Sequence, residues 1–192
     1  MGVGAVHRTR LTGNRTDARV AHWLKPTGIK SVQSFSIDTS AVLTATITAV
    51  DIGNSYVQWT GSTSTVAGTV NRALGRVVLT NSTTVTATTG GVDATIVIFG
   101  VVVEYWPGLI KSLQSDTITI GGGLTTTKAI TAVTLLKAII ILNGYSSDVG
   151  DAAQHGQSTY SVSLTNATTV TATVGVIVAS TIVVGFTVVE FY

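Results

Sequence analysis

The chain has 192 residues, of which 40% are the β-branched residues threonine (34), valine (28) and isoleucine (15), and only 10% are charged. Because β-branched side chains fit a pleated sheet better than a helix, and an ordinary soluble domain is about 25% charged, this composition argues against a mainly helical protein and against a chain disordered by charge. The absence of cysteine excludes disulfides, thiolate metal sites and a cysteine nucleophile, while the net charge of +2 hides an uneven distribution.

A basic arm comes first. Residues 1–30 carry six basic residues and one acidic residue, a net charge of +5, whereas the rest of the chain carries −3. No apolar run typical of a signal peptide occurs in this segment. Residues 16–24 fit one or two helical turns that Pro26 would end. The candidate partner-binding residues are four arginines and two apolar anchors: Arg8, Arg10, Arg15, Arg19, Trp23 and Leu24.

Three interpretations of this arm are open. We favour an arm, residues 1–28, that crosses onto an acidic neighbouring subunit through contacts that salt would weaken. The second interpretation is a disordered basic tail. The third and least favoured is a nucleic-acid contact, in which the arginines bind phosphates and Trp23 stacks on a base.

An internal repeat organises the rest of the chain. The ten residues 79–88 recur at 164–173 with nine identities. Shorter matches at offsets of 81 to 86 extend the repeat: Ile29-Lys30-Ser31 with 110–112, Ile47-Thr48-Ala49-Val50 with 130–133, and Val102-Val103-Glu104-Tyr105 with 188–191. The chain therefore divides into the arm (1–28), copy one (29–106), a joint at Pro107-Gly108, and copy two (109–192). The joint is too short for a free linker, so we expect the two copies to pack on each other or to stay closely oriented.

Copy one has the period-two pattern of β-strands. Apolar residues alternate with threonine over 43–49 and over 84–88, as in half-buried strands. Residues 95–105 are nearly all apolar, which is typical of a central strand covered on both faces. Turn signals separate these runs at Asp51-Ile52-Gly53-Asn54 and at Thr89-Gly90-Gly91.

Copy two repeats this pattern, with a nearly all-apolar run over 181–191 and a turn signal at Gly121-Gly122-Gly123. Asn143-Gly144 predicts a hairpin turn, since both residues accept positive φ. The uncharged stretch 174–189 is too short for a membrane-spanning helix and is interpreted as strands.

The predicted fold class is all-β, with two tandem small β-sandwich or barrel domains of the same fold behind the basic arm. We expect five to seven short strands in each copy. A unit of about 80 residues is marginal alone, and its uncharged strands would risk edge-to-edge pairing. These two properties favour a homo-oligomer.

Few side chains suggest chemistry. His155 lies in a polar loop with Asp148, Asp151 and Gln154, which is a possible metal or acid–base group. Copy one has no matching histidine, so a solvated loop is the favoured interpretation. No phosphate-binding loop, dinucleotide fingerprint or G-x-S-x-G elbow is present. We therefore expect no enzymatic activity, no metal and no cofactor.

A pair of glutamates occupies matched positions in the last strand of each copy. Glu104 and Glu190 are interpreted as solvent-facing or ion-paired residues, with the repeated Lys30 and Lys111 as candidate partners. Surface ion pairs of this kind contribute only about 0–1 kcal/mol.

The repeated motifs resemble a family. The frame Ile29-Lys30-Ser31-Val32-Gln33, then 79–88, then Val102-Val103-Glu104-Tyr105 is similar to small β-rich virion proteins of tailed bacteriophages, many of which carry one I-K-S-x-Q … L-T-N-x-T-T-V-T-A-T … V-V-E-F frame. This chain looks like a tandem version. The resemblance covers 29–192 and leaves the arm unmatched. It implies a non-enzymatic structural protein of the virion, with other virion subunits as partners. The homo-oligomer and the absence of a membrane partner are expected from the composition and the strand pattern.

Two functions follow from this resemblance. The arm favours a protein that decorates or cements the capsid. The alternative is a tail or fibre-tip component that binds a host surface receptor. Exposed aromatic residues in copy-specific loops would favour that alternative, and the candidates are Trp59, Tyr56, Tyr145 and Tyr160, which fit a core or an interface equally well.

Overall fold

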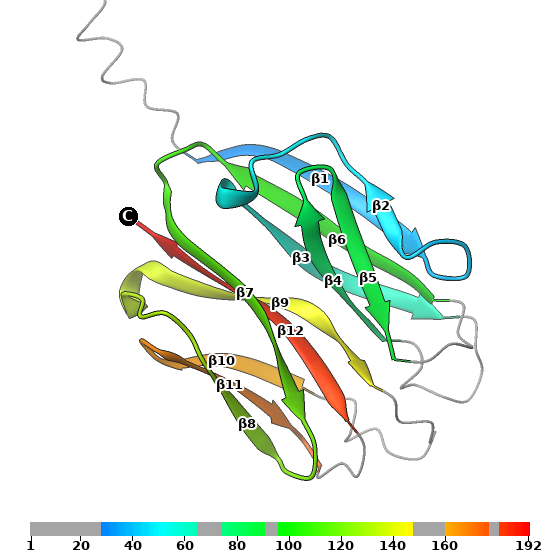
Figure 1. The fold of residues 1–192 in the computed structure, drawn as a ribbon, viewed down its shortest axis with the longest axis vertical. Helices are drawn as coiled ribbons and strands as arrows, with labels where there is room; N and C mark the ends of the chain where they lie inside the picture. Colours follow the sequence, from blue (N-terminus) through cyan, green and yellow to red (C-terminus); the bar gives the residue numbers. More distant parts are fainter. Residues whose placement is uncertain (1–27, 65–73, 91–95, 148–159, 177–180) are drawn as a thin grey trace, which may run out of the picture.

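The computed structural model describes residues 28–64, 74–90, 96–147, 160–176 and 181–192. These residues form twelve β-strands and two single-turn 3-10 helices (Figure 1). The all-β prediction is therefore confirmed. Within the described ranges, no helix combines the length and apolar character needed to span a bilayer.

Copy one contains six antiparallel strands in two sheets. One sheet has the order β1-β6-β3 and the other begins β2-β5-β4. The 3-10 helix η1 (Ile52–Asn54) precedes β3. The strands are β1 (Ile29–Asp38), β2 (Thr44–Thr46), β3 (Ser55–Ser64), β4 (Gly75–Asn81), β5 (Thr84–Thr89) and β6 (Ile96–Tyr105).

Copy two has the same strand order, with each strand six places later in the sequence. Its sheets are β7-β12-β9 and β8-β11-β10, and η3 (Leu135–Lys137) precedes β9 as η1 precedes β3. The strands are β7 (Ile110–Ile120), β8 (Thr125–Ala129), β9 (Ala138–Ser147), β10 (Tyr160–Asn166), β11 (Thr169–Val174) and β12 (Ile182–Phe191). A bridge between Arg76 and Gly144 joins β4 to β9, so the order β2-β5-β4-β9-β12-β7 runs through both copies.

Each copy has its own apolar core between its two sheets. In copy one the alternating strand β5 buries Val85 and Ala87, as its sequence predicts. Both residues belong to one cluster of buried apolar residues that also contains Ile98 of β6. In copy two the corresponding residues Val170 and Ala172 of β11 are fully buried.

A third apolar cluster lies between the two copies, on the outer faces of the β1-β6-β3 and β7-β12-β9 sheets. Its buried members are Tyr56, Val103, Ile110 and Val189. Since neighbouring residues of a strand point to opposite faces, β6 buries Val102 in its own core and Val103 against copy two. Both faces of the central strands are thus covered, which explains their nearly continuous apolar sequence.

Each core has an aromatic ring at the equivalent cross-strand position, but the ring comes from the first strand in copy one and from the last strand in copy two. In copy one Phe35 of β1 is paired with Gly100 of β6, and a Cβ at that glycine would lie 2.4 Å from the Phe35 Cζ. In copy two the partners are Asp116 of β7 and Phe186 of β12, which is fully buried. Asp116 instead pairs with Lys128 of the facing sheet at 2.8 Å.

Two sequence predictions need correction. Asn143-Gly144 does not form a hairpin turn, because both residues lie inside β9 at a bulge where the pairing with β12 shifts register. Gly144 has the positive φ of +91° that the motif suggested, but a bulge in β9 uses it, and Gly61 (φ +148°) marks the matching shift in β3.

The predicted strand over 43–49 shrinks to β2, residues 44–46. Beyond Thr46 the chain leaves the sheet, and the N–H groups of Ile47 and Val50 bond to carbonyls of the β4–β5 turn. Ile47 still reaches the core.

Candidate functional site

The two matched glutamates form the most conspicuous polar groups of the fold. Glu104 Oε1 accepts hydrogen bonds from Lys30 Nζ at 2.7 Å and from the Asp51 N–H at 3.0 Å, and its Oε2 accepts one from the Ser31 hydroxyl at 3.0 Å. The predicted ion pair is confirmed. The carboxylate does not face solvent, however, since Glu104 is only 2% exposed.

Glu190 has the same contacts in copy two. It accepts from Lys111 Nζ at 2.8 Å, from the Thr134 N–H at 2.8 Å and from the Ser112 hydroxyl at 3.2 Å, and it is 1% exposed. Each glutamate therefore ties the last strand of its copy to the first strand and to the residue before the 3-10 helix.

These contacts fix the charge state of both carboxylates. Burial of Glu104 opposes ionisation, but the bonds from Lys30, Asp51 and Ser31 outweigh burial and lower its pKa. The bonds from Lys111 and the Thr134 N–H lower the pKa of Glu190 to about 2. Because a general acid or base works best with a pKa near the operating pH, neither glutamate is suited to that role.

The other repeated polar residues also bind the backbone. Gln33 and Gln114 each form a reciprocal pair, receiving an N–H at 2.7 Å and donating to a carbonyl at 3.0 Å, with Thr48 and Thr131 respectively. Asn81 accepts from Thr83 in the β4–β5 turn, and its counterpart Asn166 accepts from Thr168 in the β10–β11 turn, again with matching distances of 2.9 and 3.1 Å. The two asparagine turns are therefore equivalent in their contacts.

A buried polar group lies where the copies meet. Asn143 is 3% exposed and donates from Nδ2 to the Thr187 hydroxyl at 2.8 Å. Within the described ranges, Asn143 Oδ1, Trp59 Nε1 and Arg76 Nε are buried without a hydrogen-bond partner. Burial lowers the pKa of the Arg76 guanidinium.

Glycines make room for this group. A Cβ at Gly144 would lie 2.3 Å from the Gly75 carbonyl oxygen and 3.1 Å from Trp59 Cγ, and a Cβ at Gly185 would lie 3.3 Å from Asn143 Cβ. Sequence reasoning missed Arg76 and Asn143 as junction residues. The available signal was a difference between the copies, because the counterpart of Asn143 is a threonine in β3 and that of Gly185 is a phenylalanine in β6.

The four aromatic candidates for receptor binding belong mainly to this junction. Tyr56 is buried in the cluster between the copies, and burial, together with Tyr105, raises its pKa to about 12. The Trp59 and Tyr145 rings lie 5.9 Å apart, and those of Tyr145 and Tyr160 lie 4.2 Å apart. All of the last three are half-buried, so the set forms an internal contact more than an exposed binding surface.

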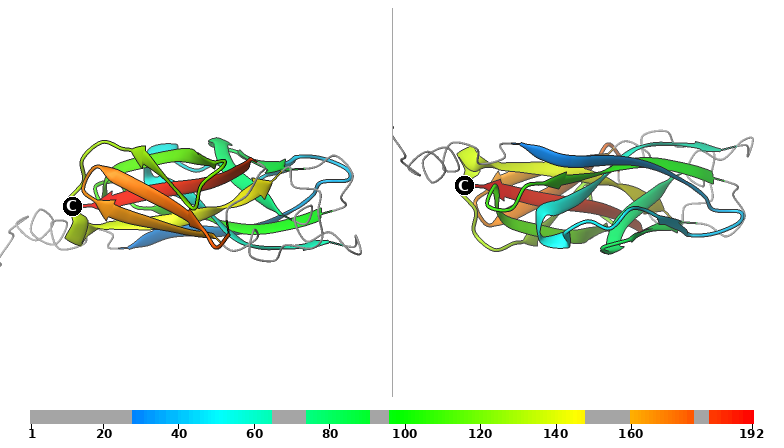
Figure 2. Two further views of the ribbon diagram at one scale, coloured as in Figure 1. Left: turned by 90° about the horizontal axis from the view of Figure 1, so that it is seen from below. Right: turned by 90° about the horizontal axis from the view of Figure 1, so that it is seen from above.

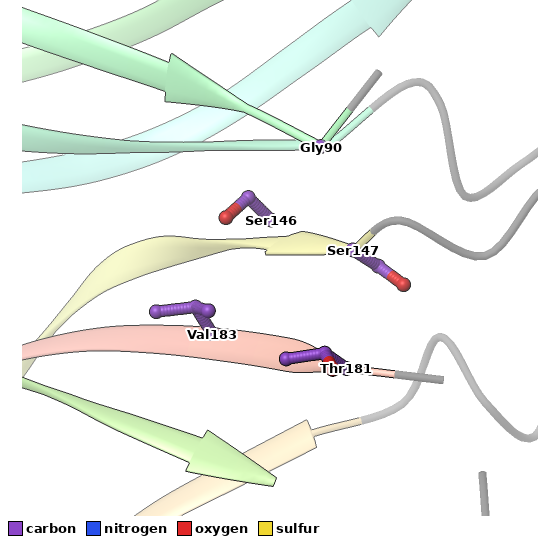
Figure 3. A pocket seen from close by; sticks show the side chains of 5 residues that line it. All are labelled: Gly90, Ser146, Ser147, Thr181 and Val183. Carbon is purple, nitrogen blue, oxygen red and sulfur yellow. The ribbon is translucent and has the colours of Figure 1, made fainter. Parts of the chain in front are cut away.

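A small open cavity of about 200 Å³ lies where the end of β9 and the start of β12 meet Gly90 of copy one (Figure 3). Its described lining consists of small and hydroxyl-bearing residues: Gly90, Ser146, Ser147, Thr181 and Val183. A Cβ at Gly90 would lie 1.7 Å from the Ser147 carbonyl oxygen, so copy one touches copy two directly here. None of these lining residues is ionisable, so they offer hydrogen bonds but no acid–base pair.

Several predicted site residues lie outside the described part of the chain. The arm residues are all among them: Arg8, Arg10, Arg15, Arg19, Trp23 and Leu24. So are His155 and its polar neighbours at 148–154. Within the described ranges themselves, no three histidine, aspartate or glutamate side chains lie close enough together to hold a metal ion.

Comparison with protein-family models, with curated protein sequences and with solved structures found no match to this chain. Function must therefore be argued from what the residues do. The geometry assigns the repeated polar residues Lys30, Gln33 and Asn81 and their counterparts in copy two to the framework of the fold.

Proposed function

We propose that this chain is a non-enzymatic structural protein of a bacteriophage particle, which decorates or cements the capsid through its N-terminal arm and forms homo-oligomers. One observation carries the proposal. The polar residues of the virion-protein frame, such as Lys30, Gln33 and Asn81, make framework contacts, and each of these contacts recurs in copy two. Because these polar side chains bond to other parts of the same fold, they support a structural role more than a reaction centre.

The proposed organisation is two tandem β-sandwich domains, copy one (29–106) and copy two (109–192). Identical strand orders, separate cores and matched glutamate contacts support this division. The shared cluster between their outer faces and the β4–β9 bridge support a rigid pair.

Attachment by the arm agrees with where the described chain starts. Gly28 lies next to Trp106, whose N–H bonds to its carbonyl oxygen, and Tyr192 bonds in the same way to Leu109. The start of β1 and the C-terminus lie toward one end of the elongated molecule (Figure 2). The net +5 of residues 1–30 would then face an acidic surface beyond that end.

The alternative function is a tail or fibre-tip protein that binds a host surface receptor. The cavity favours it, because β9 ends and β12 begins away from the start of β1 (Figure 1), and the cavity lies at these strand ends beside Ser147 and Thr181 (Figure 3). A protein anchored by one end presents the other end outward.

Incorporation into virions tests the capsid proposal. The encoding phage would be grown with the wild-type gene, with a deletion of the arm (residues 1–28), with Trp23→Ala or with Arg19→Gln. The copies per purified particle would be measured by quantitative mass spectrometry. We expect the deletion to abolish incorporation and Trp23→Ala to reduce it more than Arg19→Gln does, since a buried large side chain contributes about 1.5–3 kcal/mol and an exposed ion pair about 0–1 kcal/mol.

A matched control separates the arm from charge in general. Arg8→Gln with Arg10→Gln removes two positive charges from the arm, and Arg72→Gln with Lys128→Gln removes two from the body. The arm variant should lower occupancy at physiological salt, whereas the body variant should not. Full occupancy of the arm deletion would contradict the anchoring role, and a normal particle that fails to adsorb to its host would support the receptor-binding alternative.

A further inference from the structure

The contact between the two copies is not symmetric. Copy two contributes Ile110 and Leu113 of β7 to the shared cluster, where Ile110 is 7% exposed. Their repeat counterparts in β1 of copy one, Ile29 and Val32, are 54% and 56% exposed. The same sequence positions are thus covered in one copy and open in the other.

The asymmetry also holds for the other side of the contact. Copy one contributes Tyr56, which is 8% exposed, and η1 just before it contacts β7. The counterpart of Tyr56 is Ile139, which is 41% exposed, and the counterpart of η1 is η3, where Leu135 and Leu136 are 48% and 100% exposed. Surface apolar residues are ordinary when scattered, but Ile139 is open where its counterpart is buried, and the exposed Leu135 and Leu136 lie close to it in sequence. The counterpart of Leu135 is Ile52, which is itself 55% exposed, so burial differs at Ile139 and not at Leu135.

The equivalent residues Val103 and Val189 both lie in the shared cluster, but Tyr56 and the β7 residues Ile110 and Leu113 are used by one copy only, which leaves their counterparts open. We define the β1 patch as Ile29 and Val32, and the η3 patch as Leu135, Leu136 and Ile139. Inside the chain, the equivalent of the η3 patch in copy one already packs on the equivalent of the β1 patch in copy two. We propose that the η3 patch of one chain binds the β1 patch of a second copy of this chain, head to tail.

The chemistry of the β1 patch suits an apolar partner. Lys30, which lies between its two residues, is turned aside, since its Nζ bonds to Glu104 and lies 5.8 Å from the Trp106 ring centroid. β1 is also the edge strand of its sheet, as β7 is of the corresponding sheet in copy two. The arm joins the chain at Gly28, directly before the patch, so the arm of one subunit would start beside the neighbouring subunit.

This inference rests on the homo-oligomer part of the proposed function, and its test uses the full chain. Val32→Asp damages only the β1 patch and Leu136→Asp damages only the η3 patch. Val42→Asp is the matched control, because Val42 is 55% exposed and belongs to neither patch. Mass would be measured by sedimentation and light scattering from micromolar to hundreds of micromolar protein, with thermal unfolding as the check on folding.

We expect the wild type and Val42→Asp to associate with rising concentration. Each patch variant alone should associate at least about tenfold more weakly, since it places a charge against an apolar surface. An equal mixture of the two patch variants should form heterodimers, because one supplies an intact η3 patch and the other an intact β1 patch.

Three results would overturn the inference in distinguishable ways. If the wild type associates and both patch variants associate as strongly, other surfaces make the oligomer and only this inference fails. If the variants stay monomeric when mixed, the contact is not between unlike patches. If the wild type stays monomeric throughout, the homo-oligomer part of the proposed function fails too, while attachment by the arm is unaffected.

Discussion

Each core contains one aromatic ring at an equivalent place, but a different strand supplies it in each copy. This difference offers a direct test of the repeat. Phe186 of β12 is fully buried, and its counterpart in β6 is Gly100, whose cross-strand partner Phe35 fills the corresponding space. We predict that Phe186→Gly destabilises the protein and that adding Asp116→Phe to it restores much of the loss, because the pair then copies the arrangement of copy one.

The magnitudes follow from burial. Truncating a fully buried phenylalanine costs about 3–5 kcal/mol, and glycine in a strand adds about 0.5–1 kcal/mol. Asp116→Phe alone should cost about 1–3 kcal/mol, because Phe186 already occupies the space and the new ring overpacks it. Loss of the exposed pair with Lys128 adds at most about 1 kcal/mol to that cost. In the double variant the new ring fills the cavity, so we expect a net loss of only about 2 kcal/mol.

Equilibrium urea unfolding would measure the four free energies of unfolding in this cycle. The control is Gly100→Phe in copy one, which has no space because a Cβ at this position would lie 2.7 Å from the Gln58 carbonyl oxygen. If the double variant lost the sum of the two single losses, the two rings would not share one site, and the structural equivalence of the copies would be wrong at this position.

Three further predictions concern the carboxylates, the bulge and the joined halves. The lowered pKa of Glu190 contributes stability above about pH 4.5 that is lost as the pH falls toward about 2, so Glu190→Gln should flatten the acid limb of a plot of unfolding free energy against pH. Gly144→Ala should cost more than about 2 kcal/mol by urea unfolding, because its φ is +91° and its Cβ would meet the Gly75 carbonyl, whereas Gly122→Ala (φ +72°, open space) should cost about 1–2 kcal/mol. Copy two expressed alone would expose Val189 and should aggregate or bind a hydrophobic dye, and a monodisperse dye-free 109–192 fragment would contradict the shared cluster.

Period-two alternation and the repeat could predict the strands because each is a local property of the sequence. Val85 and Ala87 alternate with threonine and are buried, and the apolar run of β12 is a central strand covered on both faces. The partnership of Lys30 with Glu104 was also accessible, since both recur at matched positions in copy two. A repeated pair of opposite charges indicates one repeated contact.

The failures come from tertiary context. Asn143-Gly144 has the residue types of a hairpin turn, but positive φ at Gly144 serves a bulge equally well, and only the pairing of β9 with β12 decides between them. The burial of Glu104 could not be read from its neighbours, because the Asp51 N–H that covers it comes from a segment 53 residues away. The position of Arg76 could not be predicted for the same reason, since it depends on the pairing of Arg76 with Gly144 of the other copy.

The positions where the copies differ have a common physical cause. A sandwich that worked alone would keep its outer sheet face polar, yet both outer faces carry large apolar residues such as Val103 and Val189. Where the two faces meet, Asn143 of β9 and Gly185 of β12 stand at the positions of a threonine and a phenylalanine in copy one. Arg76 and Trp59 of copy one lie close to this point. The repeated residues therefore make the same contacts in each copy, whereas divergent residues such as Asn143 and Gly185 lie where the two copies meet.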